Sequence, residues 1–416
     1  MHPVRLTVDD DLERSRLTVF FRLLLALPHF VWLLLWGGLA GLIAIVNWFA
    51  VLFTGMSPEG LHTLLTRYIR YVTHVNAFVY LAANPFPGFF GVEGTYPVDV
   101  HFDPPARQNR WKTGFRLILA IPALLLSSAL FGSGGARGNG YSISFGLVAT
   151  ASFLGWFACL ARARMPRGMR DAGVYGLAYS AQLDAYLLIC TDRYPDSDPV
   201  AALGPVEVPE HPVEVAVDDD LRRSRLMVFF RLLLVLPHFV WLLLWGIAVY
   251  LVVIVNWFAT LFRGRSPAAL HRFIASYVRY QLHVTSFLYM LGNPFPGFLG
   301  REGTYPIDIR IAPPERQNRW KTGFRALLAF PALVIGSAYG SLLGVAGLLL
   351  WFASLFTAKA PRGLRNAGVA GVSYSAQVNS FLFLLTDRYP YSGPVVAALA
   401  PERPPEPGTP APLAQA

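Results

Sequence analysis

Four arginines recur at one position of a repeated motif, six residues before a proline. They are Arg22, Arg116, Arg231 and Arg325. A guanidinium group can hold a phosphate through two parallel hydrogen bonds, so these positions could bind the headgroups of anionic lipids. The alternative is that they only anchor helix ends at the membrane boundary.

Two identical clusters place basic residues beside an aromatic ring. They are Arg110, Trp111 and Lys112, and Arg319, Trp320 and Lys321. Tryptophan favours the membrane–water interface, and cations there attract anionic headgroups. We therefore include both clusters in the predicted lipid-headgroup site.

Each of two long apolar runs contains a histidine and an asparagine. The first has His29 and Asn47, and the second has His238 and Asn256. If each run folds back at its midpoint, the two side chains lie at similar depth, and we predict that they hydrogen-bond to each other. A proton relay, a metal site or a haem site is the alternative. There is no acid at this depth, only one such histidine per half and no haem-attachment motif, so we predict no metal and no cofactor.

A catalytic site on lipid would need His62 and His74 to converge with Glu93, or their copies His271, His283 and Glu302. Histidines on amphipathic helices are usually interfacial. The sequence also lacks phosphate-binding glycine loops, zinc-binding H-E-x-x-H and nucleophile-elbow motifs. We therefore predict no catalytic residues and a protein that is not an enzyme.

Composition identifies the class of protein that must position these groups. Of 416 residues, 54% are hydrophobic and 14% are charged, whereas soluble domains carry about a quarter charged residues. This balance excludes a soluble enzyme and indicates an integral membrane protein. The net charge of +10 is then explained by topology and anionic lipid rather than by nucleic acid.

The chain repeats itself. Residues 16–36 and 225–245 are identical at 19 of 21 positions, and the block RQNRWKTGFR occurs at 107–116 and again at 316–325. Weaker matches within each half divide it further. The predicted units are 1–95, 96–208 with a linker, 209–304 and 305–396, followed by a disordered Pro/Ala-rich tail at 397–416.

Each unit has the same predicted parts. An alternating strand, as at 3–8, 97–102, 212–217 and 306–311, precedes an apolar run of over thirty residues and then an amphipathic helix, as at 58–82. A single membrane crossing needs about 20 residues. The run of unit 2 carries a glycine-rich insertion, 132–141, which suits a turn in water. We predict an all-α membrane protein with four helical hairpins and about eight transmembrane helices. Interfacial amphipathic helices and short cytoplasmic strands that pair with one another complete this fold.

Charge fixes the predicted orientation. Arg137 is the only basic residue near a predicted hairpin tip, the first of which falls at Gly37–Gly38. The positive-inside rule then places both termini of a multi-pass membrane protein in the cytoplasm. The two halves should be parallel repeats about an axis along the membrane normal.

The order of motifs, with ALPHF at 26–30 and TDRYP at 191–195 and 386–390, resembles a bacterial family of multi-spanning proteins known as domain of unknown function 4389. The resemblance covers about 1–200 and 209–395. Units 1 and 3 carry NPFPGF where the family often has TDRYPPF. The resemblance implies a membrane fold and, with cytoplasmic termini, a place in a bacterial inner membrane. It implies no activity and no catalytic residues.

The predicted function is a non-catalytic membrane protein that binds anionic lipids or docks a cytoplasmic protein partner, with homo-oligomers allowed and no nucleic acid. A transporter or channel is the second hypothesis, and it requires a water-filled path lined by His29 and His238. A lipid-modifying enzyme is the third.

Overall fold

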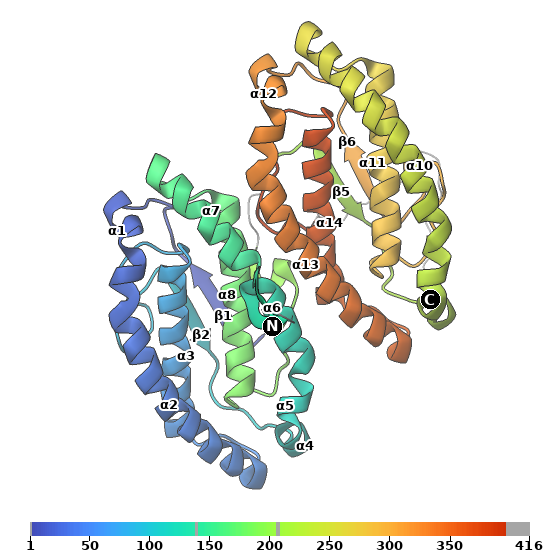
Figure 1. The fold of residues 1–416 in the computed structure, drawn as a ribbon. Helices are drawn as coiled ribbons and strands as arrows, with labels where there is room; N and C mark the ends of the chain where they lie inside the picture. The colour runs from blue at the N-terminus through green and yellow to red at the C-terminus, as the bar shows by residue number, and fades with distance from the viewer. Residues whose placement is uncertain (1, 138–139, 205–208, 397–416) are drawn as a thin grey trace, which may run out of the picture.

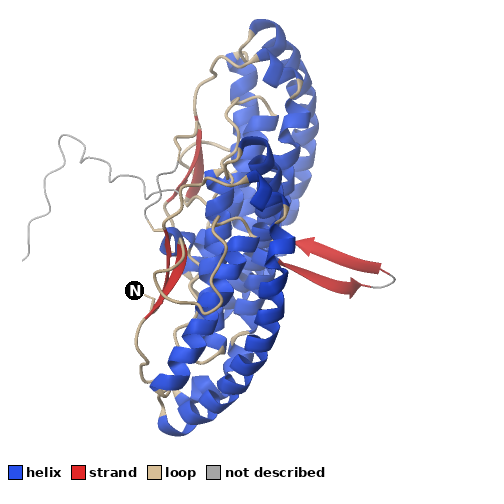
Figure 2. Cartoon of the chain, turned by 90° about the vertical axis from the view of Figure 1, so that its left-hand side faces the viewer, coloured by secondary structure: helices blue, strands red, loops and turns tan. Residues whose placement is uncertain are grey.

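The computed structural model describes residues 2–137, 140–204 and 209–396. The described chain is mostly helical, with three two-stranded sheets. The helices stack in two layers, which we call the outer and the inner layer, and two of the sheets lie on the free side of the inner layer (Figures 1 and 2). The predicted tail at 397–416 lies outside the described residues.

The outer layer consists of long apolar helices. They are α2 (Arg22–Thr54), α10 (Arg225–Arg263), α13 (Arg325–Thr357) and a broken run of α5 (Arg116–Leu119), α6 (Ile121–Phe131) and α7 (Leu147–Arg162). Short helices precede three of the runs: α1 (Arg16–Phe20), α4 (Arg110–Gly114) and α12 (Arg319–Gly323). In the described part of the chain, α2, α10 and α13 are long and apolar enough to cross a membrane.

The prediction that each apolar run folds back on itself is wrong for α2, α10 and α13, which are continuous helices. Of the two glycines at the first predicted turn, Gly37 serves helix packing, and its copy Gly246 does the same. A Cβ atom on Gly37 would lie 3.0 Å from the hydroxyl oxygen of Tyr68, and one on Gly246 would lie 3.0 Å from that of Tyr277. A small residue is therefore needed for close approach of the next helix, and the eight predicted spans are not found.

The insertion of unit 2 forms a β-hairpin of β3 (Gly132–Arg137) and β4 (Gly140–Phe145). Its two ends meet, because a Cβ atom on Gly146 would lie 2.5 Å from the carbonyl oxygen of Leu130. The hairpin projects away from the outer layer (Figure 2), and α7 follows α6 beyond it (Figure 1). The insertion therefore interrupts the apolar helical run between α6 and α7 and forms a hairpin outside it.

The inner layer contains four helices of 21 residues each: α3 (Glu59–Val79), α8 (Arg167–Leu187), α11 (Ala268–Leu288) and α14 (Arg362–Leu382). Each follows a proline, such as Pro58, whose fixed φ suits a helix start. We predicted that these amphipathic helices lie at the membrane surface. In the structure, α3 packs between α2 on one side and strand β2 on the other.

The short strands pair two by two, as predicted. Strand β1 (Val4–Val8) runs antiparallel to β2 (Val98–Phe102), and β5 (Val213–Val217) runs antiparallel to β6 (Ile307–Ile311). Each sheet joins the first unit of a half to the second. Alternate residues such as Val98 and Val100 are buried against the inner helices, as expected for strands with one face in a core.

The two halves exchange equivalent contacts. The start of α8 in the first half meets a loop of the second, where the Tyr391 hydroxyl donates to Asp171 at 2.6 Å. The start of α14 in the second half meets a loop of the first, where Asn366 donates to Asp198 at 2.8 Å. That loop leads into α9 (Pro199–Leu203). Outer helices α6 and α13 also pack together, so the halves form one continuous body.

Candidate functional site

The four repeated arginines lie at the junction of the two helical layers. Arg22 is 2% exposed, and its Nη1 donates to the carbonyl oxygen of Phe78 and, at 2.9 Å, to that of Ala83. Its guanidinium carbon also lies 4.4 Å from the ring centroid of Phe78. The last carbonyls of a helix lack intrahelical partners and carry a partial negative charge. Arg22 therefore caps the C-terminus of α3.

The other three arginines make the same contacts in their own units. Arg116 caps α8 through the carbonyls of Tyr186 and Thr191. Arg231 and Arg325 cap α11 and α14 in the same way. All four are buried. Nη1 of each donates to main-chain oxygens, Nη2 of three of them donates to a side-chain amide oxygen, and the Nε of all four has no hydrogen-bond partner among the described residues. This placement argues against the prediction that they bind lipid headgroups, because a phosphate could not reach them without opening the helix junction.

The two basic–aromatic clusters lie at the surface. The side chain of Asn109 accepts hydrogen bonds from the backbone of Trp111 and Lys112 and so starts α4. Trp111 is 78% exposed, and its copy Trp320 is 77% exposed. Lys112 lies 3.9 Å from Asp192, at the outer limit of an ion pair. These six residues therefore stay accessible to a headgroup, unlike the four buried arginines.

The clusters are tied to the ends of the outer helices. Arg319 donates to the carbonyl oxygen of Phe262 at 3.0 Å, near the end of α10. Arg110 lies in the same place beside Gly55, just past the end of α2. The structure thus places the aromatic rings and cations where one long apolar helix ends and the next begins.

The predicted pairing of His29 with Asn47 is wrong. Because α2 is continuous, the 18 residues between them span about 27 Å. His29 Nδ1 instead lies 2.8 Å from the hydroxyl of Tyr71 on α3. Asn47 accepts a hydrogen bond from Ser57 at 2.7 Å and donates to the carbonyl of Ile189.

The copies repeat this arrangement. His238 lies 2.6 Å from the hydroxyl of Tyr280, and Asn256 accepts from Ser266 at 2.7 Å. Ser57 and Ser266, which precede the first prolines of α3 and α11, therefore bond to the outer layer.

The NPFPGF loop encloses His29 with aromatic rings. The ring centroids of Phe86 and Phe89 each lie 4.5 Å from that of His29, and Trp32 donates to the carbonyl of Phe89. His29 is fully buried, and its Nε2 has no partner among the described residues. His238 is enclosed in the same way within the other half. The geometry does not favour a shared water-filled path, because each histidine is closed in by its own half.

An ion-pair network joins each first inner helix to its sheet. His74 Nε2 lies 2.9 Å from Asp99 on β2, and Arg70 lies 3.3 Å from Asp99 and 2.9 Å from Glu93. Burial alone would raise the pKa of Asp99, but hydrogen bonds from His74, Gly94 and Val100 outweigh it and hold that pKa below its ordinary value. Asp99 is therefore an ionised anchor between α3 and β2. His283, Asp308, Arg279 and Glu302 repeat the network.

Asp99 and Arg70 were not among the site residues expected from the sequence. The available signal was an acid in the middle of the apolar strand VDVHF, with an arginine and a histidine four residues apart on the preceding amphipathic helix. The histidines that we considered for catalysis do not converge, because His62 faces the backbone of Cys190 instead. In the described part of the chain no group of three or more His, Cys, Asp or Glu side chains is placed to hold a metal ion.

Comparison with known proteins gives a family and no activity. The family model described as Domain of unknown function (DUF4389) matches three times, at residues 16–91, 225–299 and 319–392. No curated protein and no solved structure matches the chain. Each match begins at or near a short helix or the first turn of a long one and runs through the following inner helix, and together the matches cover more than half of the sequence. The chain therefore belongs to the DUF4389 family and carries its domain in tandem copies.

Proposed function

We propose that this protein is a non-catalytic membrane protein that binds anionic phospholipids through its two exposed basic–aromatic clusters. The observation that carries the proposal is the exposure of Trp111 and Trp320, 78% and 77%, each between two cations at the edge of an apolar helical layer. An exposed tryptophan flanked by cations is typical of a membrane interface. The proposed location is the bacterial inner membrane, with both termini in the cytoplasm.

The outer layer is the surface that faces lipid in this proposal. Its large side chains lie outside the protein core, as at Leu34, which is 77% exposed, and Leu243, which is 66% exposed. Burying one leucine contributes roughly 1.5–3 kcal/mol. A surface with many such side chains exceeds the few hundred Å² of apolar patch that soluble monomers tolerate. Membrane lipid covers this surface.

The long helices lie along the membrane in this proposal. A helix of 33 residues is about 50 Å long, whereas the hydrocarbon core is about 30 Å thick. Arginines also occur at both ends of α2 and of α10. Arg16 and Arg225 lie by the starts of these helices and donate to the last carbonyls of α7 and α13, and Arg110 and Arg319 lie by the ends of α2 and α10. Cations at both ends of a helix allow both ends to contact the same cytoplasmic headgroup surface. In this proposal, that arrangement takes the place of the multi-pass topology expected from the sequence.

The test is native mass spectrometry of the full chain in a mild non-ionic detergent, with phosphatidylglycerol and phosphatidylcholine added as competing lipids. The variant Arg110→Gln/Lys112→Gln/Arg319→Gln/Lys321→Gln removes the four cations of the clusters. A control removes four exposed arginines on other surfaces: Arg67→Gln/Arg272→Gln/Arg301→Gln/Arg310→Gln.

We expect the cluster variant to lose phosphatidylglycerol by about tenfold or more, because each interfacial cation contributes about 1 kcal/mol. The control should retain it, and Trp111→Leu/Trp320→Leu should give a smaller loss. Equal losses in the cluster and control variants would show that net charge alone acts, and would overturn the proposal. Equal binding of both lipids by the natural protein would do the same.

A further inference from the structure

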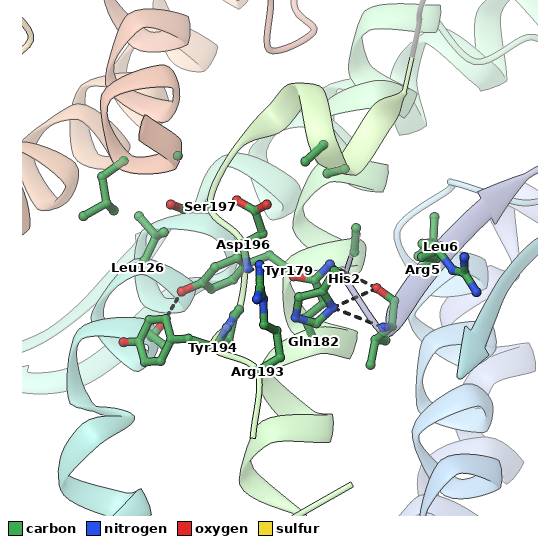
Figure 3. A pocket seen from close by; sticks show the side chains of 18 of the residues that line it. His2, Arg5, Leu6, Leu126, Tyr179, Gln182, Arg193, Tyr194, Asp196 and Ser197 are labelled. Carbon is green, nitrogen blue, oxygen red and sulfur yellow. Dashed lines mark hydrogen bonds between the residues drawn. The ribbon is translucent and has the colours of Figure 1, made fainter. Parts of the chain in front are cut away.

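A cavity of about 880 Å³ lies where the two halves meet (Figure 3). Its walls come from β1, α6, α8 and α9 of the first half, and from α13 and the start of α14 of the second. This volume falls within the range of sites that hold one small molecule. The cavity is separate from both basic–aromatic clusters.

One side of the cavity is polar. Figure 3 shows His2, Gln182 and Arg193 close together on this side. Gln182 is already engaged, because it donates to the carbonyl of Val4 and accepts from the backbone of Asp196. The groups left to meet a ligand are the exposed guanidinium of Arg193 and the buried Nε2 of His2, whose ring lies near the backbone of Tyr194. Asp196 also lines this side, and its Oδ1 accepts from the backbone amide of Asp198 at 3.0 Å.

His2 is anchored to the wall of the cavity by the backbone of Val4. Its Nδ1 lies 3.1 Å from the amide nitrogen and 3.0 Å from the carbonyl oxygen of Val4. In the tautomer in which Nδ1 accepts from the amide, Nε2 carries the proton and can donate to a ligand. Burial lowers the pKa of His2, so the ring is neutral near pH 7. A neutral donor beside a guanidinium suits a carboxylate or phosphate oxygen.

The other side of the cavity is apolar. Leu126 of α6 is 1% exposed and Leu349 of α13 is 9% exposed. Leu203 of α9 and Leu364 of α14 also line this side. Both α6 and α13 belong to the outer layer, so an alkyl chain in the cavity would lie against the inner surface of the lipid-facing helices. Each buried methylene contributes about 0.8 kcal/mol to binding.

The equivalent place in the second half differs. His211 and Arg388 correspond to His2 and Arg193, but Tyr391 replaces Asp196 and bonds across the interface to Asp171. Helix α9 borders the first-half cavity as part of the link between halves. The chain therefore supplies its own matched control, with the same histidine and arginine in a different setting.

We infer that this cavity binds one single-chain amphiphile with an anionic head, a carboxylate or a phosphate, held by Arg193 and His2 with its alkyl chain against Leu126 and Leu349. The inference does not depend on headgroup binding at the clusters. Each chain would then hold one bound amphiphile, in addition to the lipids that surround it.

The test uses hexadecanoate, hexadecyl phosphate and neutral hexadecanol as probes, with the full chain in non-ionic detergent and binding followed by native mass spectrometry. We expect one bound copy of an anionic probe and at least about tenfold weaker binding of hexadecanol. Comparison of the two anionic probes shows which head is preferred. Arg193→Gln should weaken the anionic probe by about tenfold, and Arg388→Gln should leave it unchanged.

Two further variants keep the test decisive. Leu126→Trp fills the apolar side and should abolish binding of every probe, and His2→Phe should weaken binding while His211→Phe does not. The cluster variant that loses phosphatidylglycerol should still bind the probe, which separates the two proposals. Absence of a bound probe, equal effects of Arg193→Gln and Arg388→Gln, or hexadecanol bound as tightly as hexadecanoate would each overturn the inference.

Discussion

Arg22 on the first outer helix donates to the carbonyl oxygen of Ala83 at 2.9 Å, across 61 residues of sequence. The contact fixes where α3 ends relative to α2, and three copies of it fix the other inner helices. The four basic residues that recur in every unit thus act inside the protein, whereas the cations that we propose to contact lipid occur in only two of the units.

Replacing Arg22 should destabilise the protein without removing lipid. Arg22→Gln leaves the carbonyls of Phe78 and Ala83 without their donor, and we expect a loss of roughly 1–3 kcal/mol in unfolding free energy. Denaturation in detergent measures the stability, and native mass spectrometry measures phosphatidylglycerol. A loss of bound lipid at unchanged stability would instead restore the headgroup role.

Removing the Tyr71 hydroxyl should affect stability through His29. Tyr71→Phe leaves the buried His29 ring without its hydrogen bond, at a cost of about 1–3 kcal/mol. His29→Phe/Tyr71→Phe removes both polar groups and should recover part of that loss. A double-mutant cycle measures the coupling, and additive effects would contradict the contact.

Two adjacent glycines distinguish a continuous helix from a turn. A Cβ atom on Gly38 meets nothing within 4 Å, whereas one on Gly37 meets Tyr68. Gly38→Ala should stabilise the protein by up to about 1 kcal/mol, because alanine favours helix. Gly37→Ala should not, unless Tyr68→Phe accompanies it. Thermal unfolding measures both changes, and a turn at this point would make both single substitutions destabilising.

Asp184 on α8 should make stability fall as pH rises. Burial raises its pKa to about 7, above the unfolded value of about 3.9. The carboxyl is protonated in the folded state at low pH, so its stabilising effect is complete below about pH 4 and is lost as pH rises through 7. Asp184→Asn should raise the melting temperature at pH 8 and flatten this dependence. Asp103→Asn, at an exposed site, is the control.

Asp99 should show the opposite sign. Its pKa lies below the ordinary value, so its contribution is present above about pH 4 and is lost as pH falls through the folded-state pKa. We expect Asp99→Asn to cost roughly 1–3 kcal/mol at pH 7 and much less in acid. Denaturation at both pH values measures this. An equal loss at each pH would mean that only packing had changed.

Local patterns predicted many elements of the fold. Alternation found the four strands of the two sheets beside the inner layer, but not β3 and β4, and the prolines marked the starts of the inner helices to within a residue. The apolar runs were found as well, but not their course. Gly37 and Gly38 fit a turn and a close helix contact equally well until Tyr68 is placed, and Tyr68 lies on another element.

The site was harder to predict because the sequence shows where a residue lies along its helix but not which neighbouring element its side chain faces. Arg22 was placed correctly near the start of α2, yet nothing in its own segment shows that it faces the end of α3 rather than lipid. The partner of His29 is Tyr71, 42 residues away, and no periodicity links them. Trp111 was predictable because exposure follows from its local context alone.

The reciprocal contacts between the halves have a consequence for how such a chain can evolve. The same helix position is Asp171 in the first half, facing Tyr391, and Asn366 in the second, facing Asp198. Two identical chains in a symmetric dimer must carry the same residue at both places, and aspartate at both would set Asp198 against a second carboxylate. Fusion of two copies into one polypeptide removes that constraint. Each copy can then diverge separately. An assembly that began as a symmetric dimer can in this way acquire one asymmetric cavity per molecule.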